Sequence, residues 1–164
     1  ILQPILIAGV IVHFVMGIVL ELQNRKARPV KYAKYSGGAN ASWVSRNMII
    51  TGLVVLAFLG LHMYDFWVHE MAYKYIEGNP EDPTRYYAET VEKFEPIVRT
   101  LIYVVSFVLL ALHLLHGFAS SFQSMGLNNK YSPAIQTFTK IYAIAIPAGF
   151  IFIALYHHFN PITH

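Results

Sequence analysis

Four long apolar stretches constrain the fold of this chain more than any other feature. They cover residues 3–22, 47–68, 97–122 and 137–159 of the 164-residue sequence. A helix needs about 20 mostly apolar residues to cross a bilayer, and only helices and closed barrels satisfy their backbone hydrogen bonds there. The pattern predicts an all-α, polytopic transmembrane bundle that forms a single domain over 1–164.

The composition agrees with a chain surrounded by membrane lipid. Hydrophobic residues make up 55% of it and charged residues only 13%, about half the charged share of a typical soluble domain. The net charge of +3 comes from basic residues in loops, so we expect no nucleic-acid partner. The sequence has no cysteine, which excludes a disulfide or a cysteine-ligated cluster within it. Any cofactor would be held by histidine or by packing.

The charges of the loops predict an orientation. The loop 23–46 carries six basic and no acidic residues, and the loop 123–136 carries one basic and no acidic residue. The connection 69–95 has seven acidic against three basic residues. By the positive-inside rule, the first two loops are cytoplasmic and 69–95 is outside. Within 69–95, a short surface helix is expected near 84–95.

Among the histidines inside the apolar stretches are His13, His62 and His113. An ionisable side chain in hydrocarbon is costly, so it generally has a partner or a function. His13 and His113 are each followed four residues later by a glycine, Gly17 and Gly117, on the same helix face. A glycine beneath a ligand nitrogen leaves room for a flat macrocycle, and this pattern indicates haem.

The orientation also predicts the depth of each histidine. His13 and His113 both lie late in helices that descend toward the cytoplasm. His62 follows Arg46 by sixteen residues on an ascending helix, roughly 24 Å further out at 1.5 Å per residue. We therefore expect one iron site between His13 and His113, with His62 apart from it.

Other assignments stay open at this point. His116 could replace His113 as the ligand, but Ser120 stands where a glycine would be expected; a hydrogen-bonding or propionate role then falls to His116. His62 could pair with His157 or His158 at the outer end of the last helix, or these two could simply be solvated. Small residues on one face also serve ordinary helix packing in membranes.

Three segments resemble one known family. The run from Tyr103 to Gly126, which contains His113-Leu-Leu-His-Gly117, is similar to the fourth helix of the dihaem cytochrome b subunit of succinate dehydrogenase and fumarate reductase. His13-Phe-Val-Met-Gly17 resembles the family's second helix. Thr51-Gly52, followed ten residues later by His62, resembles its third. The family has five helices, so the resemblance implies a first helix upstream that carries its own haem histidine.

The resemblance implies a membrane anchor of succinate:quinone oxidoreductase, respiratory complex II of the tricarboxylic acid cycle. Two b haems are expected, a proximal one on His13 and His113 and a distal one on His62 and the upstream histidine. Electrons would pass between an iron–sulfur subunit and a quinone, expected to be menaquinone, while a flavoprotein subunit with FAD handles succinate. The expected location is the bacterial cytoplasmic membrane.

Further residues follow from this reading. Quinone chemistry needs proton donors near the distal haem, and Asp65, His69 and Glu70 are the candidates at the outer end. Propionates of the proximal haem are expected near the cytoplasmic loops. The candidates for binding them are Arg46, Trp43, Asn47, Gln123 and Lys130. The stretch 25–35 is the expected docking surface for the iron–sulfur subunit.

Two alternatives remain from the sequence. The chain could be a cytochrome b anchor of another dehydrogenase, such as a hydrogenase or formate dehydrogenase. It could also be a haem-free transporter or proton channel whose histidines relay protons.

Overall fold

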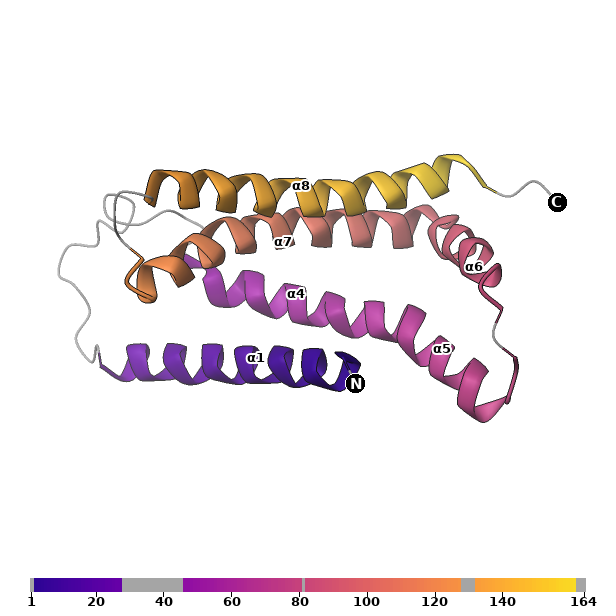
Figure 1. The fold of residues 1–164 in the computed structure, drawn as a ribbon, viewed down its shortest axis with the longest axis horizontal. Coiled ribbons are helices and arrows are strands. Elements are labelled where there is room, and N and C mark those ends of the chain that lie inside the picture. Colours follow the sequence, from indigo (N-terminus) through magenta and orange to yellow (C-terminus); the bar gives the residue numbers. More distant parts are fainter. Residues whose placement is uncertain (1, 28–45, 81, 128–131, 162–164) are drawn as a thin grey trace.

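The computed structural model describes residues 2–27, 46–80, 82–127 and 132–161. Within these ranges the regular structure is entirely helical. The helices, labelled as in Figure 1, are α1 (Leu2–Lys26), α4 (Met48–His62), α5 (His69–Met71), α6 (Arg85–Phe94), α7 (Ile97–Ser124) and α8 (Ser132–Phe159). The π-helical segment η1 (Met63–Val68) joins α4 to α5, and η2 (Ala72–Ile76) extends α5, so one continuous helix runs over Met48–Ile76.

Four helices are long and apolar enough to cross a membrane. They are α1, the Met48–Ile76 helix, α7 and α8. The predicted all-α class and the four candidate spans are therefore confirmed.

The second span is longer than the sequence predicts. We expected an outer loop from residue 69, but the helix continues through Glu70 to Ile76. Ion pairs support this extension: Glu70 pairs with Lys74 one turn later, at 2.8 Å, and with Arg85 of α6. The chain leaves the helix at Gly78, whose φ of 67° lies in the left-handed region that glycine adopts without strain.

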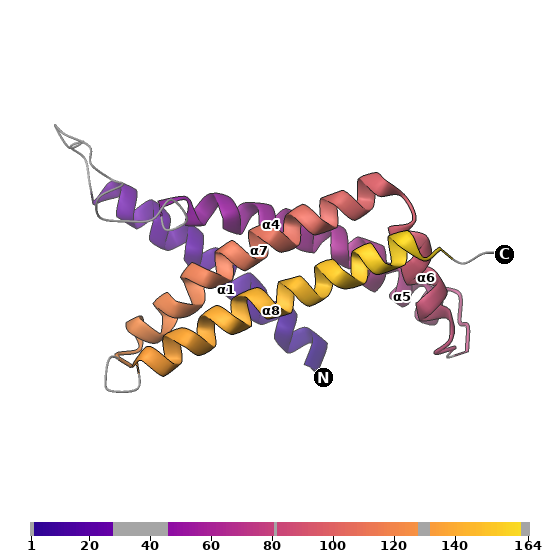
Figure 2. The same cartoon turned by 90° about the horizontal axis from the view of Figure 1, so that it is seen from above.

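The spanning helices are stacked in chain order. In Figure 1, α7 lies between α8 and α4, and α1 lies along the far side of α4. Figure 2 shows that α1 crosses the direction of α7 and α8 at a wide angle. The buried core joins α4, α6, α7 and α8. It consists of Phe58, Phe94, Tyr103, Phe107 and Ala154.

The helices alternate in direction. The carboxyl ends of α1 and α7 lie at the same end of the bundle as the amino ends of α4 and α8, and α5 and α6 lie at the other end (Figure 1). α6 agrees with the surface helix expected near 84–95. It packs inward through the buried Val91 and Phe94. The N-terminal helix α1, by contrast, has no buried residue.

Candidate functional site

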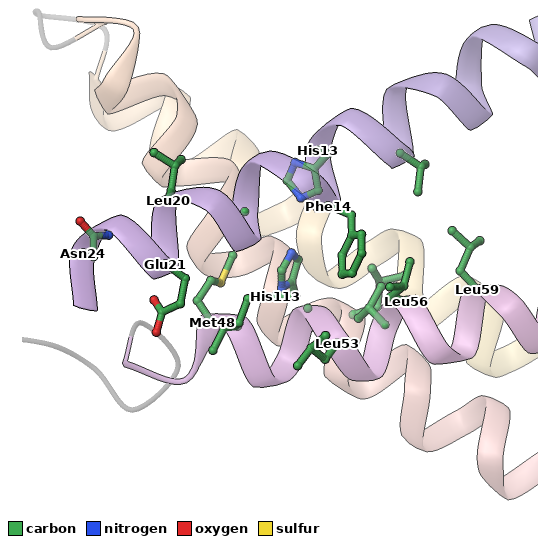
Figure 3. Close-up of a pocket in the computed structure, with 16 residues that line it drawn as sticks. His13, Phe14, Leu20, Glu21, Asn24, Met48, Leu53, Leu56, Leu59 and His113 are labelled. Carbon is green, nitrogen blue, oxygen red and sulfur yellow. The ribbon is translucent and has the colours of Figure 1, made fainter. Parts of the chain in front are cut away.

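An apolar cavity lies between α1, α4 and α7 (Figure 3). Its volume is about 440 Å³, within the range of about 300–1,000 Å³ common for cofactor and ligand sites. Hydrocarbon side chains and two glycines form most of the wall. The polar residues of the wall are His13, Glu21, Asn24 and His113.

The two histidines of the wall face each other across the interface of α1 and α7. Their ring centroids are 6.3 Å apart and their planes are inclined by 85°. In Figure 3 one nitrogen of His13 and one of His113 are directed toward the opposite ring. The structure thus brings together the two residues that the sequence assigned to one site.

The distance between the two ring centroids can be compared with that expected for two imidazoles bound to one metal ion. A metal–imidazole bond is about 2.0 Å long and the ligating nitrogen lies about 1.1 Å from its ring centroid, so two imidazoles on opposite sides of one metal have centroids about 6 Å apart. An edge-to-face contact between two rings has a similar spacing. Because both rings also border a cavity, the arrangement favours a metal ion shared by the two histidines over a simple ring contact. Two imidazoles suffice for an iron whose remaining ligands come from a macrocycle.

No larger ligand cluster competes with this pair in the described part of the chain. Among the described residues, no group of three or more His, Cys, Asp or Glu side chains is placed to hold a metal ion.

α4 holds the His113 ring from the side opposite to His13. The hydroxyl of Thr51 lies 3.2 Å from His113 Nδ1, and the same hydroxyl donates to the Met48 carbonyl at 3.0 Å. Thr51 is buried. A Cβ added at Gly52 would lie 3.4 Å from His113 Cε1, in van der Waals contact, so the α4 backbone passes directly beside the ring.

The glycines have different roles from those the spacing suggested. Gly17 lines the cavity, as expected, and a Cβ there would meet nothing within 4 Å. Gly117 does not line it; a Cβ at this position would lie 2.8 Å from the terminal methyl of Met48, so this glycine faces the Met48 side chain of α4. The second glycine of the wall is Gly52, which reasoning along one helix could not find.

The neighbours of His113 lie outside the cavity. His116 and Ser120 are half-buried on α7 and neither contributes to the wall. The structure therefore favours His113 over His116 as the residue directed into the site.

The expected propionate partners are not part of the wall either. Arg46, Asn47 and Gln123 lie at the predicted cytoplasmic end of the bundle and do not line the cavity. Trp43 and Lys130 lie outside the described residues, as does most of the expected docking stretch 25–35. Glu21, which the sequence reasoning did not assign, lines the cavity and accepts a hydrogen bond from Arg25 at 2.7 Å. Its place four residues after Gly17 was the available signal.

His62 lies apart from this cavity, as its depth predicted. It is exposed, and its ring borders three aromatic rings: Phe58 at 6.0 Å, Phe66 at 5.1 Å and Tyr103 at 6.2 Å between centroids. His157 and His158, the alternative partners considered for His62, make other contacts.

His157 packs edge-on against Tyr87 at 5.4 Å, and the Nδ1 of His158 bonds to the Phe94 and Glu95 carbonyls at 3.0 Å each. The described contacts therefore give no support to a pairing of His62 with either.

The three quinone candidates differ in their surroundings. Asp65 is buried, pairs with Arg99, and accepts a hydrogen bond from Tyr103 at 2.7 Å. Glu70 is held by Lys74, Arg85 and Tyr86. His69 is exposed. Sequence reasoning missed Arg99, although an arginine inside an apolar span signals a partner.

Comparison with known proteins adds no assignment. No family model, no curated protein and no solved structure matches the chain.

Proposed function

We propose that this chain is the cytochrome b membrane anchor of a succinate:quinone oxidoreductase or fumarate reductase, with a b haem between His13 and His113. The observation that carries the proposal is the pair of imidazoles 6.3 Å apart beside an apolar cavity. The similarity of the segments around His13, His62 and His113 to the dihaem family supports the choice of enzyme.

Each part of the cavity has a role in this proposal. His13 on α1 and His113 on α7 would hold the haem through its iron. A haem iron with two imidazole ligands transfers single electrons and keeps no open position for oxygen. The hydrocarbon wall excludes water, while Gly17 and Gly52 leave the space that side chains would otherwise fill. Glu21 keeps its charge paired with Arg25 at the edge of the cavity.

The outer half of the bundle would serve a second, distal haem and the quinone. His62 is exposed beside Phe58 and Phe66. A histidine from a further helix would be the second ligand of the distal haem. Of the quinone candidates, His69 is the exposed one, whereas Asp65 and Glu70 are occupied by ion pairs. The partners proposed are an iron–sulfur subunit at the cytoplasmic side, near 25–35, and a flavoprotein subunit with FAD beyond it. Menaquinone in a bacterial cytoplasmic membrane remains the proposed acceptor.

Haem content of histidine variants tests the proposal. We expect His13→Ala and His113→Ala to lose the haem held by this pair, because each removes one axial ligand. His116→Ala is the matched control on the same helix and should keep it. The measurement is a reduced-minus-oxidised absorbance spectrum of the chain purified in detergent, normalised to protein. Retention of the full signal in His113→Ala would refute the assignment.

The copurifying subunits separate this proposal from an anchor of another dehydrogenase. A flavoprotein with succinate dehydrogenase or fumarate reductase activity supports it. Copurification of a hydrogenase or formate dehydrogenase subunit would instead identify the chain as the anchor of that dehydrogenase.

One observation favours a second candidate, a haem-free proton channel. The buried Asp65 and Tyr103, together with the half-buried Arg99, place ionisable groups within the apolar spans, where such groups often mark proton paths. A channel predicts proton flux through liposomes that contain the purified chain, and no haem absorbance. The cytochrome predicts the reverse.

A further inference from the structure

We propose that Thr51 is a positioning residue that fixes the tautomer of His113, with the proton on Nδ1 and the free lone pair of Nε2 directed toward His13. The inference rests on the proposed haem site. It assigns a function to a side chain that does not line the cavity.

The direction of the hydrogen bonds follows from counting hydrogens. The Thr51 hydroxyl has one hydrogen and lies 3.0 Å from the Met48 carbonyl oxygen and 3.2 Å from His113 Nδ1. A carbonyl oxygen only accepts. If the hydroxyl donated to Nδ1 instead, two acceptor oxygens would face each other at 3.0 Å. The hydroxyl therefore donates to Met48 and accepts from Nδ1, which must carry the proton.

The position of the proton decides which nitrogen can bind a metal. A neutral imidazole carries its single proton on one nitrogen and a lone pair on the other. With Nδ1 protonated, Nε2 holds the lone pair. Since Nδ1 is turned to Thr51 of α4, Nε2 lies on the side of the ring that faces His13 (Figure 3).

The surroundings of Thr51 keep this arrangement in place. Thr51 is 2% exposed, so water does not compete for its hydroxyl. Gly52 of α4 lies beside the edge of the same ring: a Cβ built at this position would stand 3.4 Å from His113 Cε1. Together Thr51 and Gly52 restrain both the proton and the plane of the ring. Partners of this kind raise the basicity of a metal-bound histidine and fix its orientation.

Two variants of nearly the same size test the inference. Thr51→Val removes the hydroxyl and keeps the shape, whereas Thr51→Ser keeps the hydroxyl. We expect Thr51→Val to bind haem about 10- to 100-fold more weakly, as is typical when an outer-shell partner of a metal ligand is lost. Any haem that remains should have a higher midpoint potential, because a less basic imidazole stabilises ferric iron less. Thr51→Ser should resemble the original chain in both measurements.

A second measurement needs no haem. Nitrogen NMR of the haem-free chain with ¹⁵N-labelled histidine reports which ring nitrogen of His113 carries the proton. We expect Nδ1 in the original chain and in Thr51→Ser, and a mixture of both tautomers in Thr51→Val. A proton on Nε2 in the original chain would overturn the inference.

The outcomes separate the inference from the proposed function. If the original chain binds haem and Thr51→Val matches it in affinity and potential, the inference fails and the proposed function stands. If the original chain binds no haem, the proposed function fails, and the NMR experiment still decides the tautomer.

Discussion

At the scale of single residues, the sequence spacing pointed to the two histidines of the candidate site but not to the α4 residues that contact His113. The i, i+4 pairs His13–Gly17 and His113–Gly117 singled out the two histidines, since a repeat of four residues marks one helix face, but of the two glycines only Gly17 lines the cavity. Thr51 and Gly52 could not be assigned in this way. They act on His113 from a different helix, and their contact depends on how α4 and α7 pack.

The two glycines of α4 allow a matched test of the cavity. Gly52→Leu would place a side chain against the His113 ring and in the cavity, so we expect the haem held between His13 and His113 to be lost while helix content stays unchanged. Gly60→Leu is the control, because Gly60 is exposed on the same helix and a Cβ there meets nothing within 4 Å. Haem content and circular dichroism measure the two effects. Equal haem content in both variants would show that the cavity is not the binding site.

At the scale of helices, buried polar contacts determine how the second and third spans fit together. Tyr103 is 1% exposed and lies among the rings of Phe58, Phe94 and Phe107. Its hydroxyl donates to Asp65, which also pairs with Arg99. Hydropathy predicted that these helices exist but not that they pair in this way, since a polar side chain lowers the apolar score whether or not it has a partner.

The hydrogen bond between these two helices has a measurable cost. Tyr103→Phe keeps the ring packing and removes one donor to a buried carboxylate, so we expect a loss of about 1.5–3 kcal/mol in the free energy of unfolding. Tyr64→Phe is the control, because Tyr64 is 65% exposed on the same segment as Asp65. Unfolding in mixed detergent micelles measures both variants. A Tyr103→Phe variant as stable as the control would contradict the role given to this bond.

At the scale of the whole molecule, the sequence predicted the number of spans and their alternation, because apolar length and loop composition are local properties. It did not predict how loosely α1 is held. This helix has no buried residue, and the candidate cavity separates part of it from α4 and α7. A bound group that fills the cavity would link α1 to the rest of the bundle, which residue patterns along one chain do not show.

The orientation across the membrane can be tested with single cysteines, since the chain has none of its own. The loop charges predict that Glu77→Cys is outside and Leu127→Cys is cytoplasmic. In intact cells a membrane-impermeant thiol reagent should label the first and not the second; both should react after the membrane is opened. The opposite labelling would show that the bundle has the reverse orientation in the membrane. The histidines assigned to the inner and outer sides would then change places.

The central claim is that two imidazoles from α1 and α7 bind one haem iron. Electron paramagnetic resonance of the oxidised chain tests it most directly, because the signal reports both the number of strong axial ligands and the angle between their planes. With ring planes 85° apart, we expect a strongly anisotropic low-spin ferric signal that disappears in His13→Ala and in His113→Ala, while the signal of the distal haem on His62 remains. Absence of this anisotropic signal from the original chain, or its survival in both variants, would contradict the claim.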